Sequence, residues 1–159
     1  MHRMRPFVLG RHLFPLDRIP IVTVGKGGLD SIMTQPDAIF AEAELAQRMQ
    51  REFKDLIQVF EIYQTRTKDP RFDNFRLINL TRKIDCIDYE RSEYEMRAGD
   101  PVDVGTMHHL VLDVAKIPRD ALIFRVARDP DIILVSDAGR KKLVKMGVPD
   151  SFFGSEIFG

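Results

Sequence analysis

The sequence predicts a single α+β domain, in which a mostly antiparallel sheet carries two or three short helices packed against it. The first reason is an amphipathic helix pattern at residues 42–54, flanked by short apolar segments typical of strands. The second is an internal similarity, because the segments that begin at Pro36 and Pro130 both follow the order strand, helix, strand. The third is size, since 159 residues with 44% hydrophobic and 30% charged side chains suit one ordinary domain.

The first expected element is a strand at residues 19–24 (IPIVTV), which ends in the turn GKGG at residues 25–28. This turn lacks the G-x-x-x-x-G-K-[ST] spacing of a phosphate-binding loop, and Pro36 interrupts the region where the following helix would run. We therefore interpret it as a plain flexible turn.

A strand at residues 37–41 (DAIFA) leads into the predicted helix at residues 42–54. Its apolar side chains recur at the spacing of one helix face, on Leu45, Met49 and Phe53. This stripe predicts that the helix packs on the sheet, with these side chains in the core rather than at a cofactor.

Two further strands are expected at residues 56–64 and 75–84, as an antiparallel pair joined by a polar loop. Strands from Leu110 (LVLDVAKIP) and from Ala121 (ALIFRVA) follow, and each ends at a proline or an Asp-Pro turn.

The second strand and helix unit begins at Pro130 (PDIILV). Ser136 is suited to the helix N-cap, Leu143 and Met146 provide an apolar stripe, and Gly147 is suited to end the helix. We expect both units to pack on one mostly antiparallel sheet.

Composition argues against several classes of protein. The single Cys86 excludes an internal disulfide framework, no apolar run approaches the length of a membrane helix, and the first twenty residues lack the continuous apolar core of a secretory signal. Lysine plus arginine and aspartate plus glutamate both number 24, so the whole chain lacks the positive charge of a nucleic-acid binder. We therefore expect a cytoplasmic protein that binds neither nucleic acid nor membrane.

One local basic cluster keeps a nucleic-acid-binding regulator as a further hypothesis. Its members are Arg140, Lys141, Lys142 and Lys145, at a spacing that on a helix is more typical of a solvated face.

Neither a metal site nor a cofactor site is predicted. His108 and His109 are adjacent at the expected start of a strand, so their side chains would point to opposite faces and would not converge on a metal. Cys86 lies near Asp85 and Asp88, which would raise rather than lower its pKa, and we expect it to be a small core side chain.

The segment KIDCIDYERSEYE, residues 83–95, concentrates acidic side chains and contains the candidate site. A helical turn from residue 88 would place Arg91 beside Asp88 or Glu95, and Asp88 would cap it. Three interpretations remain open: a solvated surface, a protein-contact surface, or a set of catalytic carboxylates. The candidate partner-binding residues are Asp85, Asp88, Glu90, Arg91, Glu93 and Glu95.

The order of short motifs over residues 75–158 resembles a bacterial immunity-protein family, typified by a myxobacterial protein and numbered eleven among polymorphic-toxin immunity domains. The first motifs are Leu-x-Asn, Asp-x-x-Asp and Glu-x-Ser, followed by a Leu-Asp strand that runs to Lys-Ile-Pro, and then Ile-Phe-Arg and Ile-Leu-Val-Ser. In this chain they fall on Leu77 and Asn79, Asp85 and Asp88, Glu90 and Ser92, Leu112, Asp113, Lys116, Ile117 and Pro118, Ile123, Phe124 and Arg125, and residues 133–136.

The resemblance extends more loosely back to Asp37, which implies an N-terminal segment at residues 1–36 without assignment and an immunity-like domain at residues 37–159. It implies a protein that binds and neutralises a cognate toxin in competition between bacteria, with no catalytic residues and no cofactor. The identity of the toxin and the oligomeric state stay open. The alternative hypothesis is a small hydrolase that uses Asp85, Asp88 or Glu90 as acid or base.

Overall fold

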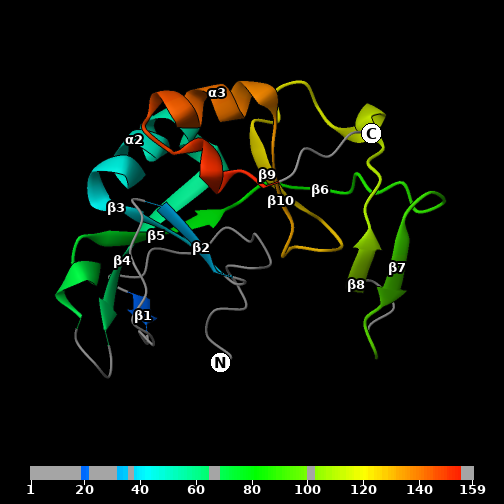
Figure 1. Ribbon diagram of the computed structural model, residues 1–159, viewed down its shortest axis with the longest axis horizontal. Coiled ribbons are helices and arrows are strands. Elements are labelled where there is room, and N and C mark those ends of the chain that lie inside the picture. The colour runs from blue at the N-terminus through cyan, green and yellow to red at the C-terminus, as the bar shows by residue number, and fades with distance from the viewer. Residues whose placement is uncertain (1–18, 22–31, 36–37, 65–68, 100–102, 155–159) are drawn as a thin grey trace.

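The α+β class is confirmed by the computed structural model, which describes residues 19–21, 32–35, 38–64, 69–99 and 103–154. The strands lie in three sheets, mostly antiparallel, and two α-helices lie next to each other on one side of the molecule (Figure 1). The expectation of one sheet for both strand and helix units is therefore wrong. The chain leaves the first sheet after Leu80, where Thr81 bonds back to the carbonyl groups of Leu56 and Asp55, and it then pairs with a different set of strands.

The largest sheet has five strands in the order β1, β4, β5, β3, β2. β5 is central, pairs antiparallel with β3 and β4, and buries Leu77, Ile78 and Leu80. β1 pairs parallel to β4 and confirms the predicted strand at residues 19–21, while residues 22–24 of that prediction and the GKGG turn lie outside the described residues. The bounds are Ile19–Ile21 for β1, Ile32–Gln35 for β2, Ala38–Glu42 for β3, Ile57–Gln64 for β4 and Phe75–Leu80 for β5.

Helix α2, Ala43–Phe53, follows β3 directly and covers one face of this sheet. Leu45, Met49 and Phe53 are each at most 3% exposed, which confirms the predicted apolar stripe. A short 3-10 turn, Lys54–Leu56, then leads into β4.

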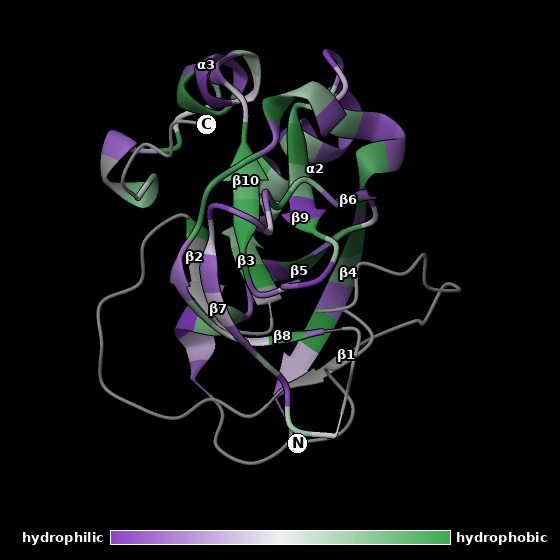
Figure 2. Cartoon of the chain, turned by 90° about the vertical axis from the view of Figure 1, so that its right-hand side faces the viewer, coloured by the Kyte–Doolittle hydropathy of each residue, from purple (hydrophilic) through white to green (hydrophobic). Residues whose placement is uncertain are grey.

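A second sheet has three strands in the order β10, β9, β6, with bounds Ile133–Val135, Ile123–Val126 and Lys83–Ile84. Because side chains alternate along a strand, β9 directs Ile123 into the core under α2 and Phe124 and Val126 into a second core. Hydrophobic residues line β3 and β10 at the centre of the molecule (Figure 2).

Helix α3, Asp137–Lys145, follows β10 and begins as predicted, because the Ser136 hydroxyl accepts a hydrogen bond from the Gly139 N–H at 3.2 Å. Gly139 is required by close packing, since a Cβ there would lie 2.1 Å from the carbonyl oxygen of Leu122. Leu143 is fully buried, and Gly147 has a φ of 97° just after the helix, in the left-handed region that favours glycine.

The third sheet is a hairpin of β7, Glu93–Met96, and β8, Val104–His109. The strand predicted from Leu110 is wrong. Leu112 makes only an isolated bridge to Ile87, and a 3-10 turn, Val114–Lys116, follows. His108 and His109 consequently lie at the end of a strand and not at its start. None of the helices in the described ranges is long and apolar enough to cross a membrane.

Candidate contact surface

The acidic segment, residues 85–95, runs from the end of β6 along the second core and into β7. At its start the side chains point alternately outward and inward, so that Asp85 is exposed while Cys86 is fully buried. Ile87 is buried beside Cys86, and together they attach the segment to the second core. The glutamates that follow, Glu90, Glu93 and Glu95, are exposed, while Cys86 and Ile87 pack in the second core.

Cys86 is a core side chain, as the sequence predicted. Burial, and then the neighbouring Asp85 carboxylate, raise the pKa of its thiol from 9.0 to about 11. The group is a neutral, inaccessible thiol near neutral pH, which argues against a nucleophile or a thiolate ligand at this position.

Asp85 is held by two neighbours that the sequence analysis did not single out. The Tyr89 hydroxyl donates a hydrogen bond to Asp85 Oδ1 at 2.7 Å, and Arg128 Nε lies 3.5 Å from Asp85 Oδ2. The Arg128 guanidinium carbon is also 5.5 Å from the centre of the Tyr89 ring, and the Tyr94 ring packs edge-on against Tyr89 at 5.7 Å. We call Asp85, Tyr89, Tyr94 and Arg128 the tyrosine–arginine cluster.

This cluster is partly buried at the surface of the second core. Burial, followed by the hydrogen bond to Asp85, raises the pKa of Tyr89, so its hydroxyl remains protonated and a donor. The four-residue separation of Asp85 and Tyr89 is visible in the sequence. Arg128, just after β9, is distant in the sequence, and only the tertiary structure brings it next to them.

Asp88 organises the turn that follows, as the capping interpretation predicted. Its Oδ1 accepts hydrogen bonds from the N–H groups of Glu90 and Arg91, both at 3.2 Å, and its carbonyl oxygen accepts one from the Ser92 N–H at 2.9 Å. The Arg91 guanidinium lies 3.7 Å from Asp88 Oδ2, which confirms the expected neighbouring pair.

The turn is fastened to the chain segment after β8. The Val111 N–H donates to the Ser92 hydroxyl oxygen at 3.0 Å, and the Val111 carbonyl oxygen accepts from the Asp88 N–H at 2.9 Å. Ser92 therefore has a structural role, because it links the acidic turn to the backbone of Val111.

The helical turn expected across residues 88–95 stops at Ser92, because β7 begins at Glu93. Glu93 and Glu95 are exposed side chains two residues apart on β7, while Tyr94 between them packs toward the second core. Glu95 Oε1 is 3.2 Å from Nε2 of the half-exposed His108 on the neighbouring strand. The expected grouping of Glu95 with Asp88 and Arg91 on a helix is thus wrong.

The six predicted site residues differ in their surroundings within this segment. Asp85 and Asp88 bind neighbouring groups, and Glu90, Glu93 and Glu95 are exposed. Within the described parts of the chain, no group of three or more His, Cys, Asp or Glu side chains could hold a metal ion.

A buried acid outside the acidic segment is Asp129, at the turn between β9 and β10, which is 9% exposed. Burial, and then the nearby Asp131 carboxylate, raise the pKa of its carboxyl. Its carbonyl oxygen accepts a hydrogen bond from the Ile132 N–H at 3.0 Å, so its backbone closes this turn.

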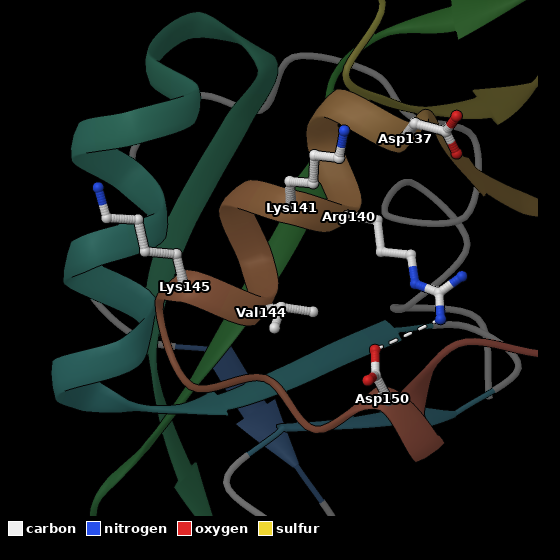
Figure 3. Close-up of a pocket in the computed structure, with 6 residues that line it drawn as sticks. All are labelled: Asp137, Arg140, Lys141, Val144, Lys145 and Asp150. Atoms are coloured by element: carbon white, nitrogen blue, oxygen red, sulfur yellow. Dashed lines mark hydrogen bonds and ion pairs between the residues drawn. The ribbon is translucent and has the colours of Figure 1, made fainter.

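An open pocket of about 480 Å³ lies on α3, and its lining includes part of the basic cluster (Figure 3). Arg140 in this pocket lies 3.4 Å from Asp150 Oδ1 and stacks over the Phe153 ring at 5.3 Å. Lys142 of the same helix forms an ion pair with Glu52 on α2. Two of the four cations are thus paired with a carboxylate, which reduces the charge available for a nucleic acid.

Residues 34–154 match the model of the Immunity protein family (Imm11). The matched region includes both helices, the second core and the whole acidic segment. No curated protein matches the chain.

Proposed function

Because the chain belongs to the Immunity protein family (Imm11), we propose that it binds a cognate bacterial toxin and neutralises it by direct contact, without a catalytic step of its own. The observation that carries this proposal is the family match over residues 34–154. We place the immunity-like domain at residues 37–159 and the site of action in the cytoplasm, where a lone thiol stays reduced.

The contact surface in this proposal is the acidic segment. It contains five carboxylates and one arginine, a net charge of −4 near neutral pH, on a surface that includes the exposed Glu90, Glu93 and Glu95. Such a field attracts a basic protein face and increases the rate of encounter.

The bonds that hold the segment support the same proposal. Asp88 and Ser92 fix the turn in the free protein through the Glu90 N–H, the Arg91 N–H and the backbone of Val111. A surface that is already ordered loses little conformational freedom when it binds, so more of the contact energy appears as affinity.

The first experiment is affinity capture with this chain as bait from a lysate of its source, washed at moderate salt, with the retained proteins identified by mass spectrometry. We expect one stoichiometric partner that carries a toxin-like domain. A bait with Glu90→Lys should retain less of it, whereas Glu44→Lys, an exposed charge reversal on α2, should not. If the unaltered bait retains no such partner, the proposal fails.

A titration then separates contact from catalysis. The purified toxin domain is mixed with increasing amounts of the chain while the toxin's activity on its own target is followed. Neutralisation by contact predicts complete loss of activity near one chain per toxin. Complete loss at a much smaller ratio would instead support the hydrolase alternative, and Asp85→Ala and Asp88→Ala would then be tested for loss of turnover.

A further inference from the structure

The β7–β8 hairpin has an open side in the described part of the chain. β7 pairs with β8 alone, and neither strand joins the five-stranded or the three-stranded sheet. Figure 1 shows the hairpin at one end of the molecule with β7 outermost. The outer edge of a strand carries backbone N–H and C=O groups that can pair with a further strand.

We propose that an extended, basic segment of the cognate toxin pairs with the outer edge of β7 and enlarges the hairpin to a three-stranded sheet. This inference rests on the proposed function, and it adds the mode of contact and the chemistry of the segment that is bound. Strand addition is a recurrent way for a sheet edge to bind a peptide, because backbone hydrogen bonds supply affinity and alternate side chains supply specificity.

The charges on β7 determine which occupant the edge suits. The exposed Glu93 and Glu95 side chains would lie beside the side chains of an added strand. A second copy of this chain that paired through its own β7 would bring glutamates against glutamates, which is destabilising. Lysine or arginine at the facing positions would instead form opposite-charge pairs, so the edge selects a basic segment.

The hairpin is attached to the rest of the fold at both of its ends. Val104, at the start of β8, is 1% exposed, and its N–H donates to the Arg128 carbonyl oxygen at 2.8 Å. Tyr94 packs toward the second core. At the other end of the hairpin, Ser92, just before β7, is hydrogen-bonded to Val111, just after β8. A two-stranded sheet by itself is only marginally stable. These contacts with the rest of the fold therefore stabilise the hairpin and its β7 edge.

The length of β7 limits the expected pairing. The ladder is irregular between Glu93 and Tyr94 and again between Glu95 and Met96. An added strand would consequently form only a few backbone hydrogen bonds, and the two glutamates, together with the 44% exposed Met96, would supply side-chain contacts.

The test uses the full chain labelled with ¹⁵N and the purified toxin domain identified by capture. Amide hydrogen exchange is measured by NMR for the free chain and for the complex. We expect the β7 amides that face outward to exchange at least about tenfold more slowly in the complex, with contacts between backbone protons of β7 and of the toxin. Amides of α2 should change little.

A pair of variants tests the charge requirement. Glu93→Lys with Glu95→Lys should weaken toxin binding by about tenfold or more at low salt, and by less at high salt. Glu44→Lys with Asp55→Lys makes the same change in net charge at exposed positions of α2 and of the 3-10 turn that follows it. α2 lies away from the hairpin (Figure 1), so this variant should leave the affinity within about twofold.

The outcomes separate this inference from the proposed function. A neutralising one-to-one complex whose β7 amides exchange as fast as in the free chain would overturn strand addition and leave the proposed function in place. Protection of β7 in the chain alone, rising with its concentration, would identify a second copy as the occupant. If the chain does not bind the toxin domain at all, both strand addition and the proposed function are wrong.

Discussion

The Tyr89 hydroxyl donates a 2.7 Å hydrogen bond to Asp85, so the first acid of the acidic segment is bound within the protein and is not a free carboxylate. Arg128 approaches the other oxygen of the same carboxylate from the end of β9. The acidic surface is thereby attached to the second core, and its outward charge comes mainly from the residues that follow.

Replacement of Tyr89 by phenylalanine should remove this hydrogen bond while it keeps the ring contacts with Arg128 and Tyr94. We expect the free energy of unfolding to fall by about 1 kcal/mol, measured by urea denaturation. Tyr63→Phe is the matched control, because Tyr63 is 44% exposed on β4. Equal losses in both variants would contradict a stabilising role for the Tyr89–Asp85 bond.

Alkaline pH should destabilise the protein through Cys86. The unfolded thiol ionises near its ordinary pKa of 9.0, whereas the folded thiol keeps its proton up to about 11. Between these values the unfolded state binds fewer protons, so the free energy of unfolding should fall as the pH rises, by up to roughly 2–3 kcal/mol.

Urea denaturation of the protein at several pH values in this window measures the effect, with Cys86→Ala as the comparison. The variant should show a smaller fall with pH, and part of the fall should remain because Tyr89 has a raised pKa and contributes with the same sign. An identical pH profile for the variant would show that Cys86 does not supply the effect.

Two substitutions of Asp88 separate its charge from its role in the turn. Asp88→Asn keeps an oxygen that can accept from the Glu90 and Arg91 N–H groups, so stability should change by only a few tenths of a kcal/mol. Asp88→Ala removes the acceptor and should cost about 1 kcal/mol in thermal or urea unfolding. Similar losses for both variants would mean that the carboxylate charge, and not the turn hydrogen bonds, is the stabilising feature.

The loss of stability on truncating a side chain of helix α3 should depend strongly on whether that side chain is buried or exposed. Leu143→Ala removes a fully buried side chain and should lower the free energy of unfolding by roughly 2–5 kcal/mol. Val144→Ala, at the adjacent and 41% exposed position, should stay within about 0.5 kcal/mol. Comparable urea midpoints for the two variants would contradict the observed packing of α3.

Local patterns predicted the helices well because the interactions that define them lie within a few residues. The stripe of Leu45, Met49 and Phe53 is buried as expected, and Ser136 caps α3. The same holds for the turn at Asp88, whose hydrogen bonds reach only as far as Ser92.

The predicted strand from Leu110 shows where such patterns fail. Val111 and Leu112 are buried, as their apolar character requires, but Leu112 packs in the second core and forms only a single bridge to Ile87. Alternating or continuous apolar residues indicate that a segment is covered and do not specify which backbone it pairs with.

The sequence alone determined the α+β class, the helices with their ends, the core position of Cys86 and the acidic character of residues 85–95. Tertiary structure alone decided that the strands divide among three sheets, that Arg128 reaches Asp85 and Tyr89, and that Glu93 and Glu95 lie on an open hairpin. The difference is physical: caps and amphipathic faces depend on neighbours along the chain, whereas strand pairing and contacts between remote side chains depend on which surfaces the whole fold can bury together.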